Sequence, residues 1–381
     1  MKIGMESPQK AGSSQISDLS VFSTTGLSDE KALSLGNTYV LKMCGTSNKI
    51  GIAASDSSCE VYSSNGSNLK KTNKFTPEKT AVNDVKFSPK NDNILYSCCS
   101  DGTIRLWDLR AGDKPAVVFE ENLDTKLFTK PLLSFDVSCN DRVLCGGAES
   151  VQGDAFMLFW DVRNTTLLGA YWNSHLDDIV QVEFDKKKCD QLMTASVDGL
   201  INVFDITELK EDDALQYSLN TEGTVDKISI ISDNTVACIT DNVDVQLWNF
   251  ETADQLCKFS REDISNAIQC ENVDDCYVIN VYKSPNDSPV ILAGSYADQG
   301  NCLRTLQINK NKLNPLSNYI GNKQIVRCSW FDYENDLLTT GGESGLLTLW
   351  KSQPNDPIIS SGKSKILAGM NKMKIRKGKP Y

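Results

Sequence analysis

The sequence holds a single histidine, His175, and this excludes most sites that depend on an imidazole ring. A catalytic triad or a mixed Cys/His zinc site needs a histidine beside other reactive groups, and no such motif surrounds His175. The pairs Gly146-Gly147 and Gly341-Gly342 end apolar runs and open no helix, so they read as turn glycines rather than phosphate loops. No G-x-S-x-G elbow occurs. We therefore expect no enzyme activity, no metal site and no cofactor.

The chain also lacks long apolar runs and paired cysteines. No stretch approaches the roughly 18 apolar residues of a membrane span, and Met1–Lys10 lacks the apolar segment of a secretory signal. The 13 cysteines are an odd number, and none has a partner at C-x-x-C spacing. We expect a reducing compartment in which the thiols are free and mostly buried. The five-residue spacing of Cys139 with Cys145, and of Cys270 with Cys276, lacks a histidine that would favour a metal.

Charge is abundant but unevenly placed. The net charge of the 381 residues is −11, which argues against nucleic-acid binding by the body of the protein. Seven basic residues and no acidic one lie from Lys363 to the C-terminus, so the rest of the chain carries −18. The sequence therefore predicts a strongly acidic body with a basic tail.

One segment shows a repeated unit clearly. In 82–110, the runs 82–87 and 94–99 have the length of short strands, and Asp101-Gly102 is a hairpin turn because both residues tolerate positive φ. Residues 103–107 alternate as a third strand, and 116–119 supply a fourth. Four short antiparallel strands make one propeller blade.

The unit recurs along the chain. Comparable segments end in an aromatic residue or its equivalent, at Tyr62, Trp107, Trp160, Phe204, Trp248, near Gln307, and at Trp350. Their spacing of 43 to 59 residues is close to the roughly 40–45 of one repeat class with loop insertions. The segment between Trp248 and Trp350 lacks a Trp-Asp end, but its runs 277–282, 290–294 and 303–308 can fill a blade. We predict seven blades.

The copies ending in Trp107-Asp108, Trp160-Asp161 and Phe204-Asp205 resemble the WD-repeat β-propeller family over roughly 33–352. Within it, the segments 134–141, 155–161, 175–184, 196–206 and 340–351 are most similar to an intracellular subgroup with a basic C-terminal tail. The resemblance implies a propeller fold but no defined activity.

The fold prediction is an all-β, seven-bladed propeller closed by an N-terminal strand. Trp350 ends the third strand of the last blade, so a fourth strand must come from elsewhere or the ring keeps an exposed edge. We expect the donor within 16–35, where 18–23 alternates as a strand should. The predicted divisions are a disordered N-terminus (1–15), the propeller (16–356) and a basic, disordered tail (357–381).

Several conspicuous residues are predicted to serve the fold. In the family a histidine before the first strand joins a buried hydrogen-bond network, and the matching partners of His175 are Ser196 and Asp198, with Phe204 in place of tryptophan. The aspartates six residues before the aromatic markers read as turn residues that accept hydrogen bonds. The structural markers are Asp101, Trp107, Asp108, Trp160, Asp161, His175, Ser196, Asp198, Asp205, Trp248 and Trp350.

Function is expected at less conspicuous positions. Family geometry places the residue before each turn aspartate, and those that open each first strand, near one rim of the central channel. The candidates for partner binding are Ser100, Asp84, Asp177, Gln181, Asp241, Arg327 and Glu343. The acidic bias among them favours a basic partner. The alternative is that each is plain solvated surface.

The tail carries Lys372, Lys374, Arg376, Lys377 and Lys379, and it reads as a nuclear-import or nucleolar segment, an RNA contact, or a disordered end. We expect a non-enzymatic scaffold for protein–protein interactions in the nucleus, alternatively in nucleus and cytoplasm, working as a monomeric propeller without membrane contact. The alternative function is an acidic escort for a basic client such as a ribosomal protein or histone. A weaker alternative is an RNA-associated factor acting through the tail.

Overall fold

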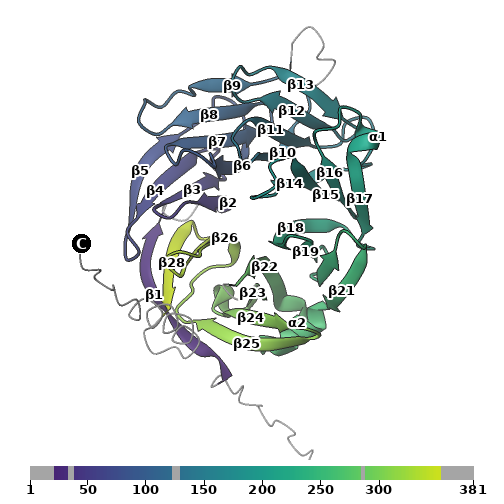
Figure 1. Ribbon diagram of the computed structural model, residues 1–381. Helices are drawn as coiled ribbons and strands as arrows, with labels where there is room; N and C mark the ends of the chain where they lie inside the picture. The colour runs from purple at the N-terminus through teal and green to yellow at the C-terminus, as the bar shows by residue number, and fades with distance from the viewer. Residues whose placement is uncertain (1–20, 33–37, 122–128, 285–287, 353–381) are drawn as a thin grey trace, which may run out of the picture.

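The strands form seven four-stranded blades around a central axis (Figure 1), which confirms the predicted all-β propeller. The computed structural model describes residues 21–32, 38–121, 129–284 and 288–352, with the backbone alone for 27–32 and 352. The predicted tail and N-terminal division lie outside the described residues. We letter the strands of a blade A to D, from the centre outward.

The first four blades each consist of consecutive strands. They are β2 (Val40–Gly45), β3 (Lys49–Ala54), β4 (Cys59–Ser64) and β5 (Leu69–Phe75); β6 (Val82–Phe87), β7 (Ile94–Cys99), β8 (Ile104–Asp108) and β9 (Val117–Phe119); β10 (Leu132–Val137), β11 (Val143–Ala148), β12 (Met157–Asp161) and β13 (Leu167–Tyr171); and β14 (Ile179–Phe184), β15 (Gln191–Ser196), β16 (Leu200–Asp205) and β17 (Leu215–Asn220).

The last three blades include the one that lacks a Trp-Asp end. They are β18 (Val225–Ser232), β19 (Thr235–Thr240), β20 (Val245–Asn249) and β21 (Asp254–Phe259); β22 (Cys276–Lys283), β23 (Pro289–Ser295), β24 (Leu303–Asn309) and β25 (Lys312–Tyr319); and β26 (Val326–Asp332), β27 (Leu337–Gly342), β28 (Leu346–Ser352) and β1 (Ser23–Ala32). Short helices α1 (Glu211–Ala214) and α2 (Arg261–Ala267) lie in connections, as do two 3-10 turns (Val273–Asp275 and Ala297–Gly300).

Strand β1 closes the ring, and it does so across two blades. Its residues from Thr25 onward pair antiparallel with β28, while Ser23–Thr25 pair in parallel with β25 of the preceding blade. The predicted closing segment 16–35 therefore contains the strand. Within the described residues the strand begins at Ser23, the last residue of the alternating run 18–23. Phe22 is buried in the core between blades 5 and 6, where the Arg304 guanidinium lies 5.2 Å from its ring.

Seven hydrophobic clusters occupy the seven interfaces between neighbouring blades in the described part of the chain. One example joins Phe75 of blade 1 to Trp107 of blade 2, whose rings stack 4.9 Å apart. Because each blade packs on both neighbours, alternate residues of its strands face opposite clusters. This is why the apolar residues alternate only weakly in the sequence: both faces of a blade are buried.

The innermost strands share a further detail. Each A strand carries a register shift near its start, for example between Val82 and Asp84 or between Val225 and Lys227. Such bulges bend a strand and redirect the inserted side chain. At this point Asp226 and Arg327 are exposed at the mouth of the channel.

Candidate interaction surface

The propeller presents two faces made of different connections. Strands B and C are joined on the same face that carries the connection from strand D of one blade to strand A of the next, because successive strands alternate in direction. The A-to-B and C-to-D connections lie on the opposite face. We call the first the acidic face, for the reason given next.

The seven B-to-C turns contain nine carboxylates and no Lys or Arg. The carboxylates are Asp56, Asp101, Glu149, Asp154, Asp198, Asp241, Asp244, Asp298 and Glu343. The described parts of the D-to-A connections add eleven acidic and four basic residues, whereas the described connections of the opposite face hold thirteen acidic and ten basic ones. The negative charge of the body is therefore concentrated on one face.

Several of these turn aspartates bind their own turn. The Asp101 carboxylate accepts from the Thr103 hydroxyl (2.7 Å) and from Arg105 Nη2 (2.7 Å). In the corresponding turn of blade 1, the Asp56 carboxylate accepts from the Ser58 hydroxyl and forms an ion pair with Lys74 at 3.0 Å. Burial tends to raise the pKa of both aspartates, but these hydrogen bonds outweigh it and hold each pKa below its usual value.

His175 is buried. The prediction of Asp198 as its hydrogen-bond partner is confirmed, but the prediction of Ser196 is wrong. Its Nδ1 lies 3.0 Å from the Asp198 carboxylate, as the sequence suggests, but its Nε2 lies 2.8 Å from the Thr194 hydroxyl. The Ser196 hydroxyl instead donates to the carbonyl of Asp177. Thr194 and Ser196 share one face of β15, and Thr194, which lies farther from the B-to-C turn, contacts the ring.

The tryptophans hold the C strands through their indole N–H groups. Trp107 donates to the Ser97 hydroxyl and Trp350 to the Thr340 hydroxyl, each at 2.9 Å. In the other two marked blades the partners differ, since Trp160 donates to the carbonyl of Glu120 and Trp248 to the side chain of Gln246.

The aspartates that end the C strands organise the turns that follow. Asp108 and Asp161 accept from the backbone N–H and the guanidinium of the arginine two residues later, and Asp205 accepts from Thr207 in the same way. These contacts lie on the face opposite the acidic one. Together with the tryptophans, they account for the marker residues through the fold.

Two of the predicted partner-binding residues line the channel. Asp84 lies half-buried on β6, where burial raises the pKa of its carboxyl. The Gln181 amide forms two hydrogen bonds to the backbone of the next blade: it donates to the carbonyl of Ile228 (2.9 Å) and accepts from the N–H of Ile228 (2.8 Å). Gln181 thus joins blade 4 to blade 5.

The other predicted partner-binding residues lie on the acidic face. Glu343 is ion-paired with Arg327, whose guanidinium also lies 5.7 Å from the Tyr296 ring. Ser100 accepts a hydrogen bond from the Asn83 amide (3.1 Å), Asp177 is half-buried, and Asp241 is exposed. The exposed negative charge on this face therefore comes from Asp241 and its neighbours more than from Glu343.

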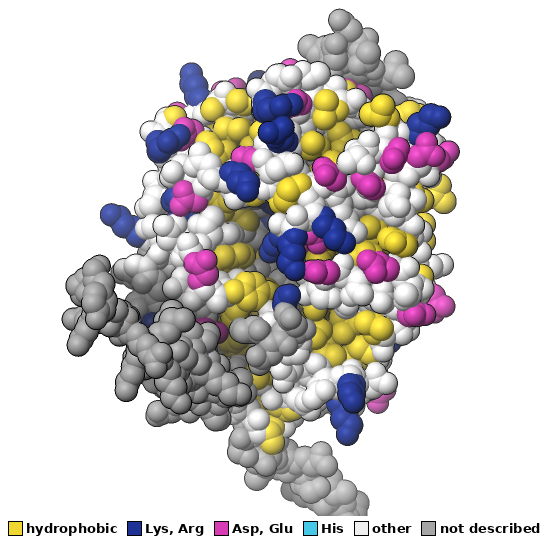
Figure 2. Space-filling view, in the orientation of Figure 1, with side chains coloured by type: hydrophobic (Ala, Val, Ile, Leu, Met, Phe, Trp, Pro, Cys, Tyr) yellow, Lys and Arg dark blue, Asp and Glu magenta, His cyan; other side chains and the backbone are white. Residues whose placement is uncertain are grey.

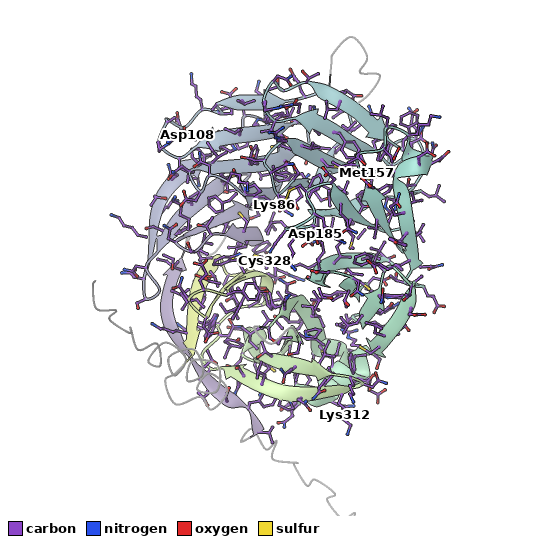
Figure 3. All side chains as sticks on the ribbon, in the orientation of Figure 1. Lys86, Asp108, Met157, Asp185, Lys312 and Cys328 are labelled. Atoms are coloured by element: carbon purple, nitrogen blue, oxygen red, sulfur yellow. A yellow bond between two sulfur atoms is a disulfide. The ribbon has the colours of Figure 1, made fainter. Side chains whose placement is uncertain are left out.

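The channel wall carries charges of both signs. Lys86 pairs with Asp136 at 3.2 Å, and Asp136 also accepts from the N–H of Phe184 in the next blade. Burial and the nearby Lys42 lower the pKa of Lys227 to about 8. Figure 3 shows Lys86, Asp185 and Cys328 around the centre of the ring, with Asp108 and Lys312 at its periphery.

The face opposite the acidic one has a pocket of about 290 Å³. Lys186, Lys187 and Lys283 line it together with Glu183, Asp185 and Asp233, so its charges balance. In the view of Figure 2, Lys and Arg side chains are interspersed with Asp and Glu, and several basic side chains lie near the centre. No group of His, Cys, Asp and Glu residues in the described part of the chain has the arrangement of a metal site.

The expectation that all cysteines are free thiols is wrong for one pair. Cys139 and Cys189 form a disulfide between the A-to-B turns of blades 3 and 4, with Cα atoms 4.9 Å apart. The two cysteines are 50 positions apart in the sequence, and only the packing of neighbouring blades brings their turns together. The other eleven cysteines are free. No helix among the described residues has the length and apolar character needed to cross a bilayer.

Comparison with known proteins supports the family expected from the repeats. Residues 69–108 match the WD domain, G-beta repeat, model of the WD40 family, a span from strand D of blade 1 to strand C of blade 2. The chain is 29% identical to the WD repeat-containing protein GTS1 of Arabidopsis thaliana over 290 residues, 73% of this chain and 70% of that protein. It is 21% identical to the WD repeat-containing protein 89 homolog of Dictyostelium discoideum, covering 90% of this chain and 92% of the homolog.

The fold has a solved counterpart. A chain of a structure titled Crystal Structure of Mitotic Checkpoint Complex superposes with a TM-score of 0.65 and 15% identity, covering 92% of this chain and 98% of that one. At this identity the likeness shows the fold alone. The subgroup resemblance seen in the sequence is that of WD repeat-containing protein 89, and the Dictyostelium homolog confirms it. WD-repeat propellers generally mediate protein–protein interactions and are typically not enzymes.

Proposed function

We propose that this WD-repeat β-propeller is a non-enzymatic platform that binds partner proteins in the nucleus, and that its acidic face takes a basic partner. The observation that carries the proposal is the set of seven B-to-C turns with nine carboxylates and no basic residue. A potential of one sign over a face steers partners of the opposite sign and rejects like-charged ones. The opposite face, where charges alternate, offers no such preference.

The same observation supports a second function, that of an escort for one basic client such as a ribosomal protein or a histone. An escort would mask the positive charge of its client, so it would have one dominant partner. A platform would have several partners of varied charge. RNA binding is a weaker candidate, because it depends on the basic tail while the acidic face repels phosphate.

The experiment is affinity purification of the full-length protein at about 50 and about 300 mM salt, followed by identification of the bound proteins. We expect basic partners that are lost at the higher salt and in Asp241→Lys, a change at an exposed carboxylate that forms no ion pair with a described residue. The matched control is Glu334→Lys, an exposed residue on the opposite face, which should leave the partners unchanged. If the basic partners survive both the salt and Asp241→Lys, the acidic face does not select a basic partner and that part of the proposal is contradicted. A set of bound proteins of varied charge would support the platform alone.

The nuclear part of the proposal has its own test. Removal of residues 363–381 should shift the protein from the nucleus to the cytoplasm if the tail directs import. An unchanged distribution, or exclusion of the full-length protein from nuclei, contradicts it. Loss of RNA crosslinking on the same deletion would instead favour the RNA-associated alternative.

A further inference from the structure

We propose that the connection 172–178, between blades 3 and 4, is the apolar anchor of the acidic face. The partner chemistry that fits it is a short protein segment in which Lys or Arg residues flank a hydrophobic side chain. This inference rests on the proposed function and adds the place and the composition of the contact.

The connection exposes two large apolar side chains. Trp172 is 48% exposed and Leu176 is 75% exposed, on a segment that crosses from the outer strand β13 to the inner strand β14. Single exposed apolar residues are ordinary on protein surfaces. Tryptophan, however, is the residue type most enriched among those that dominate binding energy. What distinguishes this pair is how firmly the backbone beneath it is held.

A buried carboxylate fixes the first half of the connection. Glu211 starts α1 in the long C-to-D connection of blade 4, which reaches this D-to-A connection. Its carboxylate accepts from the backbone N–H groups of Trp172 (2.8 Å), Asn173 (2.9 Å) and Ser174 (2.8 Å). The Ser174 hydroxyl donates to the same carboxylate. Three successive N–H groups that point at one anion leave this backbone little freedom, although it lies outside regular secondary structure.

A second carboxylate fixes the other half. Asp198 accepts from the backbone N–H of Leu176 at 2.9 Å and bonds to the His175 ring at 3.0 Å. The Asp198 carboxyl is buried, which tends to raise its pKa, yet these donors outweigh burial and keep the pKa below its usual value. His175 is anchored in turn by Thr194. A surface that is ordered before binding loses less conformational entropy when a partner docks.

The surroundings of the anchor select the charge of that partner. The five neighbouring connections 149–156, 172–178, 197–199, 221–224 and 241–244 contain eight carboxylates and no Lys or Arg. Backbone contacts join them into one surface, since Ser150 N–H donates to the Asp178 carboxylate (2.8 Å) and Asp241 N–H to the carbonyl of Thr224 (3.0 Å). An apolar anchor within uninterrupted negative charge fits a hydrophobic residue between basic ones.

The test measures the binding of two labelled peptides of equal charge to the full-length protein by fluorescence anisotropy. The first is Lys-Lys-Phe-Lys-Lys-Leu-Lys-Lys, and the second has Ser in place of Phe and Leu. We expect the first to bind at least about tenfold more tightly, from the apolar area that it buries. In Trp172→Ala and Leu176→Ser this advantage should fall to about twofold or less, while binding of the serine peptide stays unchanged. The control Leu209→Ser, at a residue 95% exposed in the C-to-D connection of blade 4, should retain the full advantage.

The outcomes separate this inference from the function on which it rests. If both peptides bind equally and Asp241→Lys weakens both, the acidic face binds basic partners but the anchor is wrong. If neither peptide binds, the function of the acidic face fails as well. If the advantage of the first peptide arises only after residues 363–381 are removed, the chain's own basic tail is the occupant, and the proposal of a separate partner is overturned.

Discussion

Replacing Glu211 with alanine should free the connection that carries Trp172 and Leu176. The change leaves three backbone N–H groups without their acceptor, at a site where the carboxylate itself is buried. A buried donor left unsatisfied costs about 1–3 kcal/mol. This connection is near the surface, so water can replace part of each contact, and the lower end of that range applies. Three donors then give a loss of about 3 kcal/mol in the free energy that holds the connection in place.

Hydrogen exchange followed by mass spectrometry measures this loss directly. Since about 1.4 kcal/mol corresponds to a tenfold change, we expect exchange of the amides of Trp172, Asn173 and Ser174 to rise by about a hundredfold in Glu211→Ala. The control is Asp212→Ala, one residue away and exposed, which should leave the exchange unchanged. If Glu211→Ala shows less than a threefold increase, the carboxylate does not order the connection, and the argument from a preformed anchor is refuted.

Three further predictions concern the rest of the fold. Phe22→Ala should lower the free energy of unfolding, measured in urea, by about 3 kcal/mol, because it removes buried apolar contacts. The control Val21→Ala, at an exposed residue, should leave this free energy unchanged. Equal effects of the two changes would show that Phe22 does not anchor the closing segment. The Lys227 ammonium loses its proton more easily in the folded protein than in the unfolded chain. Between about pH 8 and about pH 10 the unfolded chain therefore holds more protons, and the free energy of unfolding should rise with pH. Lys227→Met should remove this rise, and an unchanged pH profile in the variant would show that other groups cause it. Reduction of the Cys139–Cys189 disulfide, which closes a loop of about 50 residues, should lower the melting temperature, and the double serine variant should no longer respond to reductant.

The repeat pattern predicted the blades because each blade is encoded locally. The strands 82–87, 94–99 and 103–107 follow from apolar runs and one turn, and the structure places them at β6, β7 and β8 with shifts of at most one residue. Even the blade without a Trp-Asp end follows from three apolar runs between Trp248 and Trp350. Short runs and tight turns depend on neighbours in the sequence, so the sequence suffices for them.

The candidate site was less accessible, because its contacts join residues that are distant in the chain. The acidic residues expected at the rim were Asp84, Asp177, Asp241 and Glu343, but Arg327, itself a candidate, forms an ion pair with Glu343. The contact between Glu211 and Trp172 spans 39 residues and two blades, and no local motif announces it. The signal in the sequence that would have pointed to this surface is an aromatic residue close to acidic residues in a D-to-A connection.

The sequence by itself determined the number of blades, the turns between their strands, the need for an N-terminal closing strand and the total negative charge. Only the tertiary structure decided that β1 spans two blades, that Thr194 rather than Ser196 meets His175, and that Cys139 pairs with Cys189. It also decided that the carboxylates gather on one face, since a residue's face depends on the direction of its strand within the ring. Strand period and turn chemistry are local properties, whereas these contacts arise only when neighbouring blades pack against each other.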